Sequence, residues 1–504
     1  MAIKFEGRAR EHAATLAAAN RSPYAVAGPI ISSLKSRLDE QAAVRHGEGL
    51  ADTVFDSAGF TTRVPRRPVP QSWTRTIFVL LTTLLLCNVL FFGMRVAGTY
   101  LPKERVAEEV RQGLVNGVFS VPDYASNYLI GMDQWTDCLS FELALSPSSS
   151  ILAASVAPHV LVAPAANQRC AAVVDFVQGR YRVEQLFEYT RFWHGYSTLM
   201  TLALQLMPLK AYRGLLTMLC YGAIAFAGLA AAAAGRPALL SLLPLLAGTF
   251  AFSQINQLGG LVSHSPAFIA MWILAGLVLL LYRSLSFTRL LAMMLGLGAL
   301  EGFLDTMILC PLSAALALIV AGCARAGQLR MESWRGLAGF YAAIGGAWCL
   351  GFLGTYVFKL AATAAVIGYD PVIGPFLDQL KLRMALTGPQ PKFYLSSLYG
   401  QLWRLAYGEF YPRAVTLLAL TVMVLGWIAA LAQFAAACAA GVGTQARNAG
   451  GGFVLATLVI FAWFTLFREH TDTHAFFMVR VTIVWIFAGW CWFIAQRTGL
   501  GSPS

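Results

Sequence analysis

The sequence predicts an all-α integral membrane protein with about ten transmembrane helices. The 504-residue chain is 57% hydrophobic and only 12% charged, whereas a soluble domain carries about 25% charged residues. Long apolar runs recur along the chain, and most lysines and arginines stand in the short gaps between them, where the orientation signals of membrane proteins belong. The net charge of +12 therefore indicates a bilayer as the partner and no nucleic acid.

Ten apolar segments have about the length that a membrane-crossing helix needs, roughly 17–25 residues. They lie near 76–94, 212–234, 237–252, 266–282, 290–302, 306–323, 337–362, 414–437, 451–467 and 476–495, and the third and fifth are short. Residues 195–207 are also apolar, but a crossing there would place the basic gaps that follow on the outer face. We therefore expect an interfacial helix at 195–207.

The basic gaps also predict the orientation. With the N-terminus inside and ten crossings, the connections that contain Arg236, Arg283, Arg325 and Arg447 all fall on the cytoplasmic side. The sequence thus predicts a multi-pass protein of the bacterial inner membrane with both termini in the cytoplasm. The expected parts are a polar, partly disordered segment 1–75, a membrane domain 76–497 with external insertions 95–211 and 363–413, and a tail 498–504.

Two aspartates mark the first external insertion. Asp133 and Asp137 are four residues apart, which places both carboxylates on one face of a helix. Such a pair can hold a divalent cation, Mg²⁺ or Mn²⁺, or can supply a general base and the group that orients it. The alternative is a solvated helix end. Cys138 and Cys170 lie in the same insertion, and they form a disulfide if it faces an oxidising compartment or else stay two free thiols.

Aromatic and imidazole side chains are the second candidate site. Trp193 and His194 follow Arg191 in the segment Tyr189–Tyr196. Aromatic rings stack on sugar faces, and a histidine can donate to an anion. The alternative is an aromatic anchor for a helix at the headgroups.

Charged residues at membrane depth form the third candidate site, because each costs about 2.5–3.5 kcal/mol on insertion. Glu301 and Asp305 are four residues apart between two apolar runs, and they indicate either a functional site or a polar hairpin tip. His470 and His474 could ligate zinc, but the spacing fixes no third ligand. Arg480 in the last apolar run calls for an anion, either one of those carboxylates or a ligand phosphate.

Four segments together resemble a bacterial family of polytopic membrane proteins whose layout is similar to that of GT-C type glycosyltransferases. These segments are Asp133–Asp137, Tyr189–Tyr196, Gly302–Leu312 and His470–Arg480. The resemblance extends over most of the chain from about residue 76, but only through short motifs. The chain has no Walker loop, dinucleotide fingerprint or GxSxG elbow, and a lipid-linked donor would need none.

The resemblance implies a GT-C-like fold with interfacial helices in the long first external loop. It also implies a glycosyltransferase that moves a sugar from a polyprenyl-phosphate donor to an envelope glycan or lipid acceptor on the external face. By position, Asp133 or Asp137 would be the base or metal ligand, although the insertion lacks the Asp-X-Asp pattern of the family. The residues expected to bind substrate are Trp193, His194, Glu301, Asp305, His470, His474 and Arg480.

A leaving lipid phosphate needs a cation, which Arg480, Lys359, Lys381 or Arg383 can supply. Two other functions fit the sequence. One is a transporter or flippase for a lipid-linked or polar solute, whose charged groups would line a path that reaches both faces. The other is a non-catalytic partner in envelope assembly, in which no single carboxylate would matter.

Overall fold

The chain divides into two compact units, Met1–Gln71 and Ser72–Ser504. All the residues that the computed structural model describes belong to the second unit. They are residues 73–118, 134–147, 150–162, 168–282, 284–304, 307–325, 334–384, 386, 412–441, 443–474 and 478–498. The expectations for segment 1–72, for Asp133, for Asp305 and for the tail after residue 498 therefore lie outside the described residues.

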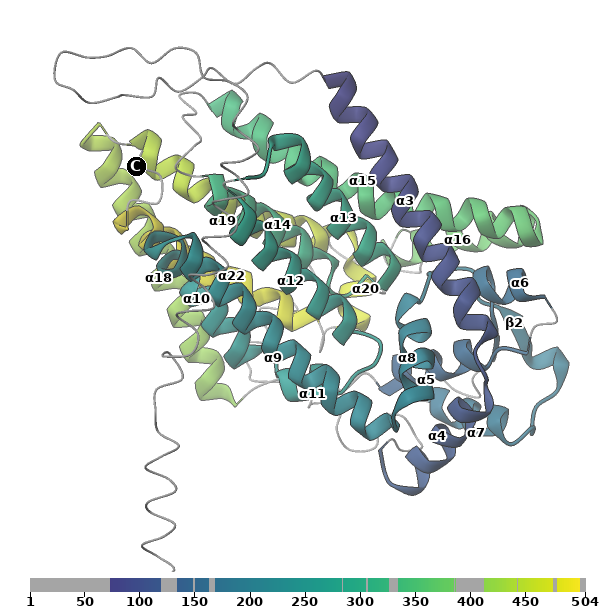
Figure 1. The fold of residues 1–504 in the computed structure, drawn as a ribbon. Coiled ribbons are helices and arrows are strands. Elements are labelled where there is room, and N and C mark those ends of the chain that lie inside the picture. Colours follow the sequence, from purple (N-terminus) through teal and green to yellow (C-terminus); the bar gives the residue numbers. More distant parts are fainter. Residues whose placement is uncertain are drawn as a thin grey trace, which may run out of the picture. The chain divides into compact units, whose positions relative to one another are not determined.

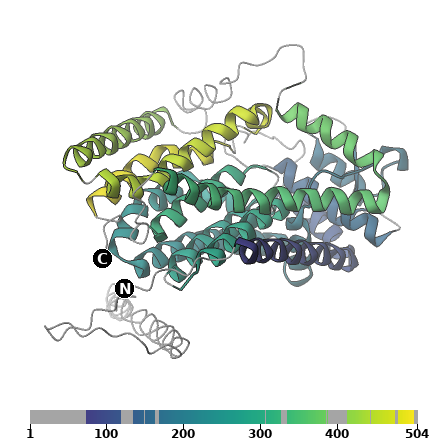
Figure 2. The same cartoon turned by 90° about the horizontal axis from the view of Figure 1, so that it is seen from above.

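The second unit consists mostly of apolar helices (Figures 1 and 2). Five of the described helices are long and apolar enough to cross a bilayer: α3 (Trp73–Tyr100), α9 (Leu209–Ala234), α13 (Phe287–Leu304), α15 (Trp334–Ile367) and α18 (Arg413–Ala439). Four more are apolar but shorter or only partly apolar: α10 (Arg236–Phe252), α12 (Ser265–Leu281), α14 (Cys310–Arg325) and α19 (Gly443–Leu466). The chain is therefore a helical membrane protein.

Each of the ten predicted spans overlaps one of these helices or the last one, α22 (Ile483–Arg497). The segment 290–302, which looked short, belongs to an 18-residue helix that meets the length needed for a span. The last segment starts with a 3₁₀ turn, η3 (Val479–Thr482), before α22. Residues 195–207 form a separate 12-residue helix, α8 (Gly195–Leu206), which is too short to cross a bilayer.

Exposed apolar side chains show which helices face lipid. Only 11% of an 18-residue apolar stretch of α3 is buried, and the exposed residues of this helix include Phe78, Leu86 and Leu90. In water such a surface would be costly, but hydrocarbon tails are as apolar as leucine. By contrast, 61% of the corresponding stretch of α13 is buried, so α13 lies in the interior of the bundle.

Glycines bring α13 and α15 into close contact. A Cβ atom at Gly298 would lie 2.0 Å from the carbonyl oxygen of Trp348, and one at Gly351 would lie 2.0 Å from that of Leu295. Gly302 follows Gly298 by four residues on the same face and also approaches the backbone of α15. Small residues at this spacing let membrane helices approach to backbone contact.

Short elements follow α3 and form a compact group beside the bundle (Figure 1). They are α4 (Glu104–Val115), α5 (Gln134–Leu145), α6 (Ile151–Val156), α7 (Arg169–Val177), η2 (Val183–Gln185) and α8. Two strands that the sequence did not indicate, β1 (His159–Leu161) and β2 (Leu186–Glu188), pair antiparallel with Val160 opposite Phe187. This group has its own apolar core around Phe141, Val173 and Met200.

Two further helices lie near this group. The external insertion predicted at 363–413 starts inside the end of α15 and continues as α16 (Asp370–Arg383). In Figures 1 and 2, α16 lies at the same end of the bundle as the short helices α4–α8. It contacts α20 (Arg468–Thr473), the short helix that follows α19.

Candidate functional site

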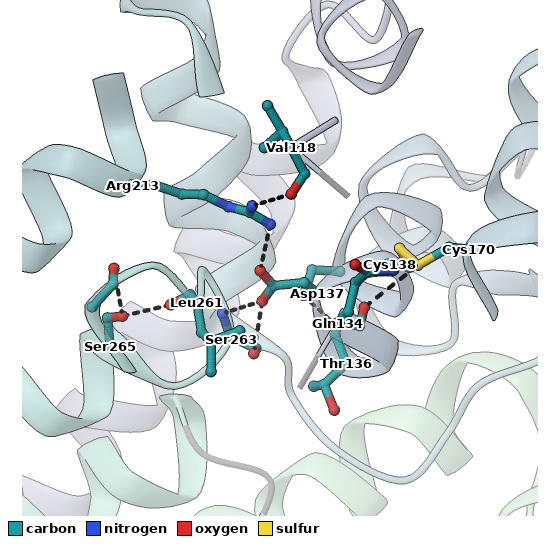
Figure 3. A network of polar contacts seen from close by, with 12 residues as sticks. Val118, Gln134, Thr136, Asp137, Cys138, Cys170, Arg213, Leu261, Ser263 and Ser265 are labelled. Carbon is teal, nitrogen blue, oxygen red and sulfur yellow. Dashed lines mark hydrogen bonds and ion pairs between the residues drawn. A yellow bond between two sulfur atoms is a disulfide. The ribbon is translucent and has the colours of Figure 1, made fainter. Parts of the chain in front are cut away.

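Asp137 forms a buried polar network (Figure 3). Its side chain is fully buried on α5. One carboxylate oxygen accepts a hydrogen bond from Nη2 of Arg213 at 2.9 Å, in the first turns of α9. The other accepts from the backbone N–H of Ser263 at 3.2 Å and from its hydroxyl at 2.9 Å, just before α12. The carboxylate therefore ties the insertion to two apolar helices.

These contacts favour a structural role for Asp137 over that of a base or a metal ligand. Burial raises the pKa of its carboxyl, and Arg213 and Ser263 oppose that rise. Beside it, Cys138 and Cys170 form a disulfide that joins α5 to α7, so of the two alternatives open in the sequence the bridge is the one observed. Asp133, the other half of the predicted pair, lies outside the described residues.

A metal site finds no support in the described part of the chain. Within it, no three His, Cys, Asp or Glu side chains gather closely enough to hold an ion. Asp137 is a poor ligand because a guanidinium already pairs with its carboxylate. A Mg²⁺ or Mn²⁺ ion at the predicted aspartate pair therefore stays a prediction.

Two cations are buried where α3 and α15 meet the insertion. Arg95 is 4% exposed and Lys359 is 1% exposed. Nε of Arg95 donates to the carbonyl oxygen of Ser155 at 3.3 Å and Nη1 to the hydroxyl of Ser197 at 2.7 Å. Nζ of Lys359 donates to the carbonyl oxygen of Val156. Neither side chain forms an ion pair with a described residue, so their polar partners are carbonyl and hydroxyl oxygens.

Trp193 and His194 are buried beside these cations. The indole Nε1 of Trp193 donates to the carbonyl oxygen of Thr355 at 3.2 Å, and Nζ of Lys359 lies 5.5 Å from the ring centroid. Nδ1 of His194 hydrogen-bonds the hydroxyl of Tyr196, and no described group bonds its buried Nε2. These contacts place both side chains in the protein interior rather than at a headgroup surface.

His194 is neutral at pH 7. Burial lowers the pKa of its imidazole well below the usual value, and the charges of Arg95, Lys359 and Arg191 lower it further. A small cavity of about 10 Å³ lies beside Arg95, which is room for about one water molecule. The surroundings of this cluster are therefore basic and polar.

Two half-buried arginines lie next to this cluster. The guanidinium of Arg191 lies 5.7 Å from the ring centroid of Tyr189. Arg383, at the end of α16, interacts electrostatically with the same tyrosine. Burial lowers the pKa of Arg383, and the like charge of Arg191 lowers it too, while Tyr189 and Glu469 oppose both effects. Two guanidinium groups from distant segments are thus near enough for their charges to interact.

The histidines of α20 complete this assembly. His470 is 2% exposed, and its Nε2 lies 3.1 Å from the carbonyl oxygen of Met307. The rings of His470 and His474 are 4.7 Å apart. Burial lowers the pKa of His470 well below its usual value, and His474 and Arg383 lower it further. Three segments that are distant in the sequence therefore come together here: the motif around Arg191, the end of α16, and α20.

Glu301 and Arg480 are buried elsewhere in the bundle. Glu301 lies within α13 and is 1% exposed. Arg480 lies in η3, before the last apolar helix rather than inside it, and its Nε donates to the carbonyl oxygen of Ser253 at 2.9 Å. Nη2 of Arg480 also donates to Oε1 of Gln254 at 3.2 Å. Ser253 caps the C-terminal end of α10, where a cation is favourable.

Backbone strain is found at these polar groups. The described non-glycine residues with positive φ are His194, Gln254 and Met307. Gln254 accepts from Arg480, and Met307 accepts from His470. A left-handed backbone costs an L-residue of order 1–2 kcal/mol, and such strain clusters at functional sites.

The sequence had no spacing signal for Arg95. Its one visible sign is an arginine near the end of a 28-residue apolar helix, which is costly without a partner. Comparison of the chain with protein-family models, with curated proteins and with solved structures finds no match.

Proposed function

We propose that the protein is a membrane glycosyltransferase of GT-C type. It would take a sugar from a polyprenyl-phosphate donor and pass it to an envelope glycan or lipid on the external face. The observation that carries this proposal is a group of four basic side chains, Arg95, Lys359, Arg191 and Arg383, around the segment Tyr189–His194. Arg95 donates to the carbonyl oxygen of His194 at 3.4 Å, Lys359 and Arg191 lie over the rings of Trp193 and Tyr189, and the charge of Arg383 interacts with Tyr189 and Arg191. Glu469 is the one described carboxylate that acts on Arg383, so the group has an excess of positive charge that an anion would neutralise.

A lipid phosphate matches this site in charge and position. Arginine forms paired hydrogen bonds with phosphate oxygens, and Arg191 and Arg383 are the half-buried members of the group. Arg95 and Lys359 are more deeply buried, and their positive charge would act through a low-dielectric interior. The same field stabilises the negative charge that appears on the phosphate oxygen when the bond to the sugar breaks. Of the two aspartates that the sequence singled out, Asp133 would then be the one left to hold a divalent cation, because Asp137 already pairs with Arg213.

The disulfide supports the proposed orientation. Bridges persist in oxidising compartments and are rare in the cytosol, so Cys138–Cys170 favours an external insertion. With that insertion outside, we place the protein in the bacterial inner membrane with about ten spans and both termini in the cytoplasm. The donor would then reach the cation group from the outer leaflet, beside the lipid-facing helix α3.

Consumption of a labelled donor tests the proposal. The purified protein in lipid nanodiscs is incubated with polyprenyl-phosphate sugars tritiated in the sugar, together with a membrane extract as the source of acceptor. We expect the wild-type protein to release the label from the lipid. Arg383→Gln should release it at least tenfold more slowly. Lys381→Gln is the matched control. Lys381 was a candidate in the sequence and lies on the same helix, but its side chain is 55% exposed and sits 3.8 Å from Asp378, so it does not belong to the cation group.

Two outcomes contradict the proposal. If no donor sugar is released by the wild-type protein, the chain is not a glycosyltransferase of this kind. If the donor is not consumed but crosses the bilayer of sealed proteoliposomes intact, the protein is a transporter or flippase.

A further inference from the structure

The orientation of the His470 ring is fixed by one contact. Its Nε2 lies 3.1 Å from the carbonyl oxygen of Met307. A carbonyl oxygen only accepts hydrogen bonds, so Nε2 must carry the proton. In a neutral imidazole the other nitrogen, Nδ1, then has a lone pair. The fold therefore determines which nitrogen of His470 can accept a proton.

That second nitrogen has no hydrogen-bond partner among the described residues. Nδ1 of His470 is buried, and no described group hydrogen-bonds it. A buried acceptor without a partner costs about 1–3 kcal/mol. Met307 adds a further cost, since its φ of +71° is left-handed. The fold thus tolerates two unfavourable features at this imidazole, an Nδ1 without a described partner and a left-handed residue at the contact of Nε2.

The charges around His470 keep that lone pair available. The charges of His474, which follows α20, and of Arg383 on α16 act on His470. Arg468 and Glu469 are its charged neighbours in the chain, and Glu469 also acts on Arg383. Burial, His474 and Arg383 disfavour an imidazolium, and they lower the pKa of His470. The neutral form of His470 is therefore favoured, and its Nδ1 lone pair carries no proton.

Its position fits one step of the proposed reaction. Arg383 acts on His470 and also belongs to the cation group that would hold the leaving phosphate. Of the two carboxylates predicted for the proton transfer, Asp137 is occupied by Arg213 and Ser263, and Asp133 lies outside the described residues. An acceptor hydroxyl must lose its proton as it attacks the sugar, and a histidine is the commonest group for this task.

We propose that His470 is the general base of the transfer, with Nδ1 taking the proton of the acceptor hydroxyl; this inference rests on the proposed function. The acceptor oxygen forms a bond to the anomeric carbon of the sugar. The bond from that carbon to the phosphate oxygen breaks, and its electron pair stays on the phosphate. The proton moves to Nδ1, and the imidazolium then releases it to water.

Two substitutions at one position separate the base from a structural role. His470→Gln can keep an N–H near the position of Nε2 and thus the bond to Met307, but it has no basic nitrogen. His470→Asn places its amide near Nδ1 and loses the bond to Met307. A base contributes typically 10²–10⁴-fold, so we expect kcat for donor consumption to fall by that factor in His470→Gln. KM and the unfolding midpoint should stay close to wild type.

The pH profile gives an independent measure. In the wild-type protein, kcat/KM should fall with unit slope as the pH drops below the pKa of His470, with a midpoint below 6.5. This acid limb should vanish in His470→Gln and persist in His474→Gln. A structural role would instead make activity follow stability, with His470→Asn the worse variant, and would leave the acid limb in place.

Each outcome is decisive. Wild-type protein that never consumes donor overturns the proposed function and the base with it. Wild-type activity together with a His470→Gln variant that keeps kcat within threefold overturns the base alone. A large rise in KM without loss of kcat would likewise show that His470 binds substrate instead of accepting a proton.

Discussion

Replacing Asp137 by Asn tests whether this carboxylate is structural. The change keeps the size of the side chain but removes the charge that pairs with Arg213 at 2.9 Å. The side chain of Asp137 is 1% exposed and that of Arg213 is 11% exposed. Removing one partner of a buried pair costs about 3–5 kcal/mol. The amide oxygen can still accept from Ser263, so we expect a loss near 3 kcal/mol in the free energy of unfolding.

The assay is equilibrium unfolding by SDS in mixed micelles, followed by tryptophan fluorescence. Asp175→Asn is the matched control, because Asp175 pairs with Arg180 at 2.7 Å while their side chains are 38% and 62% exposed. Exposed pairs contribute about 0–1 kcal/mol. A double variant of Asp137 and Arg213 should lose less than the sum of the single variants.

A different result would refute this reasoning. If Asp137→Asn unfolded like wild type and yet abolished donor consumption, Asp137 would be a catalytic group after all. If both Asp137→Asn and Asp175→Asn cost less than 1 kcal/mol, the ion pair would not hold the insertion in place.

Three more predictions follow from the structure. Replacing Cys138 and Cys170 by Ser removes a bridge across 32 residues and should lower the free energy of unfolding by about 3.5 kcal/mol. In the wild-type protein, maleimide should label neither cysteine until a reductant is added, and labelling without reductant would contradict the bridge. Gly298→Ala should destabilise by about 1–3 kcal/mol, since its Cβ would meet the carbonyl oxygen of Trp348, while Gly296→Ala on the same helix has open space and should be neutral. The free energy of unfolding should fall as the pH drops below about 6.5, by at most about 1.4 kcal/mol per pH unit for each histidine. The reason is that burial lowers the pKa of His194 and His470, so the unfolded chain binds protons that the folded one does not. His194→Gln should remove the contribution of one histidine to this slope, and an unchanged slope would contradict a lowered pKa at His194.

The helices were readable from the sequence because hydrocarbon sets their length and composition. Each apolar segment found by hydrophobic length overlaps a helix, and five of the described helices are long and apolar enough to cross a bilayer. The basic residues between the segments separated 195–207 from them. The two short strands were missed, because three residues such as His159–Leu161 carry too little alternation to indicate a strand.

The site was harder to predict, because its contacts join residues far apart in the chain. Spacing suggested that Asp137 pairs with Asp133, yet its described partners are Arg213 and Ser263, 76 and 126 residues away. The contact of His470 with Met307 spans 163 residues. A pattern of i,i+4 residues identifies one face of one helix and carries no information about the helix opposite.

Affinity for a lipid phosphate is the most direct test of the cation group. Binding of polyprenyl phosphate without a sugar is measured on the protein in nanodiscs, with the uncharged polyprenol as the ligand control. We predict tight binding of the phosphate alone, a Kd raised at least tenfold by Arg191→Gln or Arg383→Gln, and no change with Lys381→Gln. Equal affinity for the phosphate and the alcohol, or a Kd that neither arginine affects, would contradict an anion site at this end of the bundle.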